Sequence, residues 1–155
     1  MQLTEINQTL GVTGRDFYYR AQQLQKAMLE NLKPEDLIEP PIKHYFANGT
    51  YVREMFAPTG SVIIGKTHRH DHICIVLQGR AMVYSEDGQF EIQAPYTFVA
   101  KKGAKRIFVV LEDLIFQNVH PANSTDLEEL EHELIVSEDD ENAVRDFRLS
   151  IGLEY

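Results

Sequence analysis

Between Thr50 and His120 the sequence is a succession of short β-branched, aromatic and aliphatic runs, separated by turn residues. Runs of this kind are typical of antiparallel strands, and Asp87-Gly88 between two of them is a hairpin signal. No helix-length segment intervenes, which favours a barrel or jelly roll over a parallel sheet. The expected strands are Tyr51–Phe56, Ser61–Ile64, Ile73–Leu77, Arg80–Tyr84, Gln89–Ile92, Thr97–Ala100, Ile107–Leu111 and Leu114–Val119.

Helical patterns flank this β region. Apolar residues in the stretch from Arg15 to Leu32 recur at helical spacing, and Pro34 should end that helix. After Pro121, the pair Thr125 and Glu128 forms a capping box ahead of a helix that should run to about Ile135. Ser137 should start a second helix. We therefore expect one domain over residues 1–155, with a barrel core of about 50–121 and helical extensions at 14–33 and 125–151.

Composition excludes several classes of protein. The net charge of −9, from 15 Lys+Arg against 24 Asp+Glu, argues against nucleic acid or an anionic membrane as a partner. No apolar run approaches the ~18 residues of a membrane span. The segment Met1–Leu10 lacks the features of a signal peptide, and the single Cys74 cannot form an internal disulfide. These features predict a cytoplasmic protein.

One segment, from Gly60 to Gly79, places a lysine and two histidines at a distinctive spacing between two glycines. Gly60 is followed by five residues, Lys66-Thr67-His68, three residues, His72, six residues and Gly79. This frame resembles the first motif of the cupin superfamily, which places His-x-His and then Glu at the positions of Lys66, His68 and His72.

A second segment resembles the second cupin motif in the same way. Pro95 is followed by five residues, Lys101-Lys102-Gly103, two residues, Arg106, three residues and Val110. Arg106 stands where the family has its third His, and Gly103 matches the family in identity. The resemblance covers about Tyr51 to Pro121. It implies a mainly β fold, an antiparallel cupin (jelly-roll) β-barrel with an N-terminal helix and two C-terminal helices.

The resemblance implies a pocket lined by Lys66, His68, His72 and Arg106, where cupins hold a transition metal. A protonated Lys cannot bind a metal and Arg is effectively always charged, so two of these four positions oppose a cation. The run His68-Arg69-His70-Asp71-His72 offers another ligand set, because imidazoles at alternate positions of an extended segment share one face. One hypothesis is therefore a divalent metal (Zn, Fe, Ni or Mn) on His68, His70 and His72. The others are a metal-free polar pocket and no functional site.

Lys66 and Arg106 allow two further interpretations. They could bind an acidic group of a ligand, or they could pair with an inward carboxylate such as Glu54. We expect a small-molecule-binding cupin, with or without a metal cofactor, and a homodimer that covers exposed strand edges. The alternative is a non-catalytic accessory or assembly protein that uses the barrel as an oligomerising scaffold. The motifs do not distinguish an enzyme from a binding protein.

Overall fold

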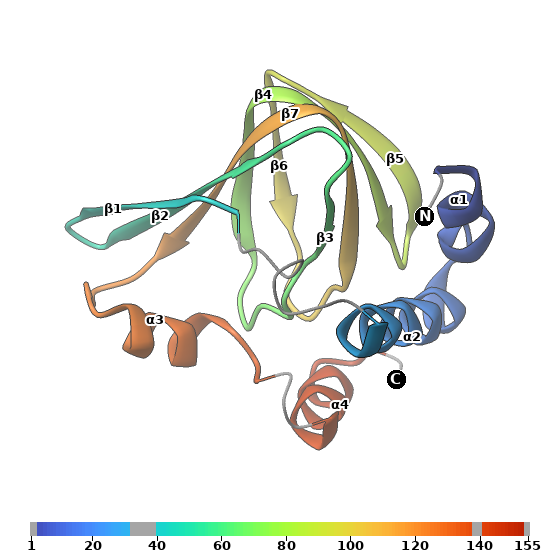
Figure 1. The fold of residues 1–155 in the computed structure, drawn as a ribbon. Helices are drawn as coiled ribbons and strands as arrows, with labels where there is room; N and C mark the ends of the chain where they lie inside the picture. Colours follow the sequence, from blue (N-terminus) through green and yellow to red (C-terminus); the bar gives the residue numbers. More distant parts are fainter. Residues whose placement is uncertain (1–2, 32–39, 138–140, 154–155) are drawn as a thin grey trace.

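The computed structural model describes residues 3–31, 40–137 and 141–153, and Figure 1 shows their arrangement. Helices α1 (Leu3–Leu10) and α2 (Gly14–Asn31) precede the β region. Helices α3 (Leu127–Leu134) and α4 (Glu141–Ser150) follow it. The strands between them are β1 (Ile42–Ala47), β2 (Thr50–Ala57), β3 (Val62–Ile64), β4 (His72–Ser85), β5 (Gly88–Gln93), β6 (Tyr96–Ala100) and β7 (Arg106–Pro121). No helix among the described residues combines the length and the apolar character that crossing a membrane requires.

The strands form one antiparallel, seven-stranded sheet in the order β1-β2-β7-β4-β5, with β3 on β7 and β6 on β4. The expected antiparallel, mainly β architecture is confirmed. The sheet is curved but open, so the barrel is not closed. Its two end strands, β1 and β5, stand at opposite ends of the strand order and each pairs with one neighbour.

Strands β4 and β7 are long, and besides pairing with each other, each pairs with two shorter strands along its length. β4 pairs with β6 through His72–Val76 and with β5 through Arg80–Ser85. The register of β4 against β7 shifts between Val76 and Ala81, at a bulge that contains Gly79. Gly79 has φ +87°, and a Cβ there would lie 2.1 Å from the carbonyl oxygen of Asp113. Only glycine fits this bend, which folds the two parts of β4 toward a shared core.

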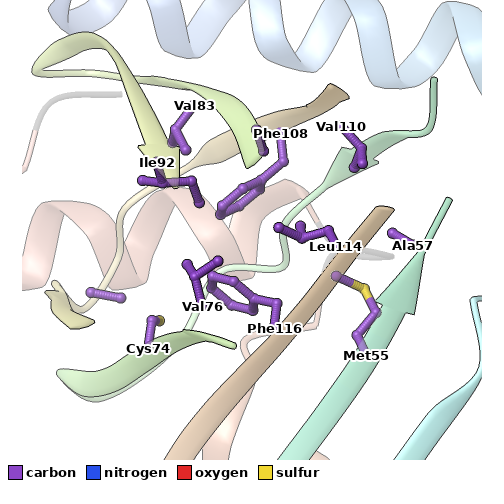
Figure 2. Packing of buried hydrophobic residues seen from close by; sticks show 12 residues of the cluster. Met55, Ala57, Cys74, Val76, Val83, Ile92, Phe108, Val110, Leu114 and Phe116 are labelled. Atoms are coloured by element: carbon purple, nitrogen blue, oxygen red, sulfur yellow. The ribbon is translucent and has the colours of Figure 1, made fainter. Parts of the chain in front are cut away.

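The main core lies between the two parts of the sheet (Figure 2). It is built by alternate residues of β2, β4 and β7, because side chains on a strand point to opposite faces in turn. Val76 and Val83 are fully buried, and Phe108 packs edge-on against Phe116. Its buried members are Met55, Ala57, Cys74, Val76, Ala81, Val83, Ile92, Ala100, Phe108, Val110, Leu114 and Phe116.

The helices pack against the sheet and against each other. α1 and α2 bury Ile6, Leu10 and Phe17 against Tyr84 and Ile107 of β4 and β7. The predicted N-terminal helix is therefore found, and its expected end at Leu32 to Pro34 lies outside the described residues. α3 begins with Asp126 as its N-cap rather than Thr125, since the Asp126 carboxylate accepts from two amides of the first turn.

The C-terminal helix α4 is joined to the sheet by one buried arginine. Arg148 is completely buried, and its guanidinium bonds to both carboxylate oxygens of Glu86, at 2.7 and 2.8 Å. It also donates to the carbonyl of Gly103 and stacks on the ring of Tyr18, 4.0 Å from the ring centre. A single side chain thereby connects α4, α2 and two turns of the β region.

Candidate metal and ligand site

A cavity of about 560 Å³ opens between the sheet and α3. Its walls come from β1, β2, β4 and β7, and from Leu127, Leu130 and Leu134 of α3. In Figure 1, α3 lies below the projecting β1–β2 hairpin. The volume is that of a site for a small molecule.

Three histidines come together in this cavity. His68 precedes β4, His72 begins β4, and His120 lies near the end of β7. One ligand atom from each ring lies within 4.8 Å of the others. The ring centres of His68 and His72 are 4.3 Å apart, and those of His72 and His120 are 4.5 Å apart. Metal–imidazole bonds of about 2 Å bring ligand nitrogens to about 3.3 Å, so modest ring movements would complete a metal site.

The orientation of the His72 ring is fixed by its neighbours on β7 and β4. Its Nε2 lies 3.0 Å from Oδ1 of Asn118, and the Cys74 thiol donates to the same oxygen over 3.4 Å. Because an amide oxygen can only accept, Nε2 of His72 carries the proton in this arrangement and Nδ1 holds a lone pair. Nδ1 is buried and has no hydrogen-bond partner among the residues that the structure describes. A ring held on one nitrogen, with its other nitrogen unpaired, is the arrangement of a metal-binding histidine.

All three imidazoles are held neutral, as metal ligands must be. Burial, followed by the nearby His72 and His120, lowers the pKa of His68 to about 3. Burial and the neighbouring His72 lower the pKa of His120 to about 4. Burial also lowers the pKa of His72, and the hydrogen bond of this ring to the Asn118 oxygen and its interaction with the His70 backbone oppose the shift in part.

Two of the expected site residues lie outside the histidine cluster. The His70 side chain is exposed, and among the described residues the three-histidine cluster takes His120 in its place. The expected set of His68, His70 and His72 therefore differs from the geometry, because the chain turns between His68 and His72 instead of running as one strand. Lys66 lies at the rim, where its Nζ is 3.0 Å from Glu131 Oε1 of α3 and more than half of its side chain is exposed.

Arg106 does lie in the cavity wall, beside the histidines. Its guanidinium carbon is 5.1 Å from the centre of the Phe98 ring. Its Nε and Nη1 are buried and have no hydrogen-bond partner in the described part of the chain. Burial lowers the pKa of Arg106, although an arginine stays charged across the physiological range. Glu54, the partner considered from the sequence, instead accepts from Gln117 at 2.8 Å.

Sequence reasoning missed His120 and Asn118 as site residues. Both lie on the inward face of β7, where Phe116, Asn118 and His120 alternate as buried residues. This period of two is visible in the sequence and could have indicated them. Their position opposite β4 depends on the pairing of Ile73 with Val119 and of Cys74 with Asn118, which only the folded sheet defines.

The fold and the site together define an open antiparallel sheet protein with a histidine-lined cavity. No known protein family and no curated protein matches the chain. The solved structures that resemble it include cupin and double-stranded β-helix proteins.

Three such structures illustrate the degree of similarity. A protein with a double-stranded β-helix domain from Klebsiella pneumoniae has 21% identity and a TM-score of 0.49, over 64% of this chain and 90% of that chain. A cupin-2 domain protein from Shewanella frigidimarina has 14% identity and a TM-score of 0.46, over 62% and 99%. An RmlC-like cupin from Methanocaldococcus jannaschii has 12% identity and a TM-score of 0.46, over 60% and 88%.

Proposed function

We propose that this chain is a metal-dependent cupin that binds a small molecule, with one divalent transition metal held by His68, His72 and His120. The observation that carries this proposal is the approach of three histidine ligand atoms to within 4.8 Å of one another. Zn, Fe, Ni and Mn all stay candidates, because imidazole binds several divalent transition metals. Nδ1 of His72, which has no partner among the described residues, would be available as one ligand atom.

Three protein ligands would leave coordination positions open toward the cavity, as in catalytic metal sites. A bound metal there would act as a Lewis acid toward an oxygen of the ligand. The protein itself would contribute a water-excluding wall, formed by aromatic side chains of the sheet and leucines of α3. At the rim the Lys66 ammonium is paired with the Glu131 carboxylate at 3.0 Å, which offsets its repulsion of a cation.

Metal content of the purified protein tests the proposal. The protein should be produced without a histidine tag, in medium that contains all four metals, and analysed by inductively coupled plasma mass spectrometry. We expect about one ion per chain, as for a single three-histidine site. His68→Ala and His120→Ala should remove it while circular dichroism shows an intact fold.

His70→Ala and Lys66→Met are the matched controls. Both residues lie next to the site in sequence, but His70 is exposed and Lys66 is at the rim, so both variants should keep the metal. A wild-type protein without stoichiometric metal would overturn the proposal. A metal that is lost in His70→Ala and kept in His120→Ala would assign the site to the other histidine set.

A further inference from the structure

The guanidinium group of Arg106, in the wall of this cavity, has buried N–H groups without a hydrogen-bond acceptor among the described residues. A buried cation is ordinarily paired with an anion or fully hydrogen-bonded, because removing it from water is costly. Here Nε and Nη1 have no acceptor among the described residues, and the surface under the guanidinium is the apolar ring of Phe98. The stacking on Phe98 orients the guanidinium plane but provides no hydrogen-bond acceptor.

The charges around the cavity reinforce this imbalance. Its lining includes three cationic side chains, Arg53, Lys66 and Arg106, against one carboxylate, Glu131. Lys66 and Glu131 neutralise each other at the rim, which leaves the two arginines without a carboxylate in the lining. The formal charge of the lining is therefore positive, in a protein of net charge −9.

We propose that Arg106 is the anchor for a carboxylate group of the ligand, so that the cavity takes a small organic acid. A guanidinium offers parallel N–H groups that match the two oxygens of a carboxylate, and the resulting hydrogen bonds are charge-assisted. The aromatic and aliphatic lining, which includes Phe108 and Phe116, accommodates an apolar remainder of the acid. The inference rests on the cavity of the proposed function and names its ligand class.

Nuclear magnetic resonance tests the anchor directly. The Nε–H of Arg106 is shielded from solvent, so its signal in the 15N-labelled protein should exchange slowly and be visible. The signal is assigned by its absence in Arg106→Gln. Acetate is the probe, acetamide is its neutral isostere, and chloride at matched ionic strength controls for screening. We expect a saturable shift of the Arg106 signal with acetate, and none with acetamide or chloride.

Two variants separate a specific anchor from general positive charge. Arg106→Gln should weaken acetate binding, followed on other cavity signals, by roughly 10- to 100-fold, the contribution of a charge-assisted hydrogen bond. Arg53→Gln removes the other arginine of the lining and should change the affinity far less. Equal losses in both variants, or equal shifts with acetate and acetamide, would overturn the inference. The wild-type comparison of acetate with acetamide remains decisive if Arg106→Gln fails to fold.

The same titration on metal-free His68→Ala keeps the two proposals distinguishable. Saturable acetate binding in this variant supports the carboxylate anchor, whether or not the wild-type protein holds a metal. A wild-type protein that contains stoichiometric metal but shows no saturable shift at Arg106 would overturn the anchor alone.

Discussion

Nε2 of His72 donates a hydrogen bond of 3.0 Å to Oδ1 of Asn118, and Nδ1 of the same ring has no hydrogen-bond partner among the described residues. The His72 ring lies in the cluster formed with His68 and His120. His72 and Asn118 come from different long strands, β4 and β7, whose pairing places Cys74 opposite Asn118. The orientation of the His72 ring therefore depends on how β4 pairs with β7.

Asn118→Ala should lower metal affinity by about 10- to 100-fold, because the His72 ring loses the partner that fixes its tautomer and orientation. Competition with a chromophoric chelator measures the affinity. Gln117→Ala is the control, since Gln117 lies next to Asn118 on β7 and bonds to Glu54 instead of a histidine. Equal affinities in Asn118→Ala and wild type would contradict an orienting role for Asn118.

The metal-free protein should lose stability as the pH falls below about 6.5. His68 and His120 have folded-state pKa values of about 3 and about 4, so the unfolded chain binds protons first and is favoured in acid. Each of these histidines contributes at most about 1.4 kcal/mol per pH unit between its unfolded and folded pKa values. Above about pH 6.5 both states are neutral at these sites and this dependence ends.

Urea unfolding at a series of pH values measures this effect. His120→Asn removes one of the two groups and should flatten the pH dependence of the unfolding free energy. An identical slope in His120→Asn and wild type would show that His120 does not titrate as its burial implies.

Arg148→Met should lower the free energy of unfolding by about 3–5 kcal/mol, because Glu86 is left with an uncompensated charge at a largely buried site. The variant also loses the hydrogen bond to Gly103 and the contact with Tyr18. Arg145→Met on the same helix is the control, since its pair with Asp146 is exposed and should contribute less than about 1 kcal/mol. Chemical denaturation of both variants compares them, and similar losses would refute the assigned role of Arg148.

Gly79→Ala should destabilise the fold far more than Gly60→Ala, although both glycines have positive φ. At Gly60 a Cβ meets nothing within 4 Å, so the cost is the backbone strain of about 1 kcal/mol or slightly more. At Gly79 the Cβ would collide with the Asp113 backbone, and β4 and β7 would have to separate at the bulge. Thermal melting of the two variants, or the soluble yield if Gly79→Ala does not fold, decides between them.

We also propose that the chain forms a homodimer through the outer face of β4 and β6. Ile73 and Val99 are paired neighbours there, 46% and 51% exposed, and Leu77 lies nearby on β4 at 50%. Burial of such side chains against a second copy would stabilise association. Light scattering should give twice the 17.8 kDa chain mass.

Val99→Glu should shift this dimer to monomer, while Leu149→Glu, at a similarly exposed residue of α4, should leave the mass unchanged. A wild-type monomer at micromolar concentration would contradict the dimer. It would also remove support from the alternative in which the sheet serves as an oligomerising scaffold.

The strands were predictable where one face is buried, since alternation of apolar and polar residues is a local property of the sequence. β2, β3, β5 and β6 lie close to their expected positions. β1 was not predicted, because most of its side chains are exposed and leave no such pattern. Gly79 was interpreted as the end of a strand, whereas the structure uses it to bend the continuous strand β4.

For the site, too, some features follow from the sequence alone and others depend on the tertiary structure. The sequence by itself determined that His68 and His72 lie close together, because only three residues separate them, and that Arg106 follows a tight turn at Gly103. Only the tertiary structure decided that His120 joins them, that His70 faces solvent and that Lys66 pairs with Glu131 of α3. The physical reason is that strand register and helix docking bring together residues far apart in the chain, and these depend on the whole core rather than on any local segment.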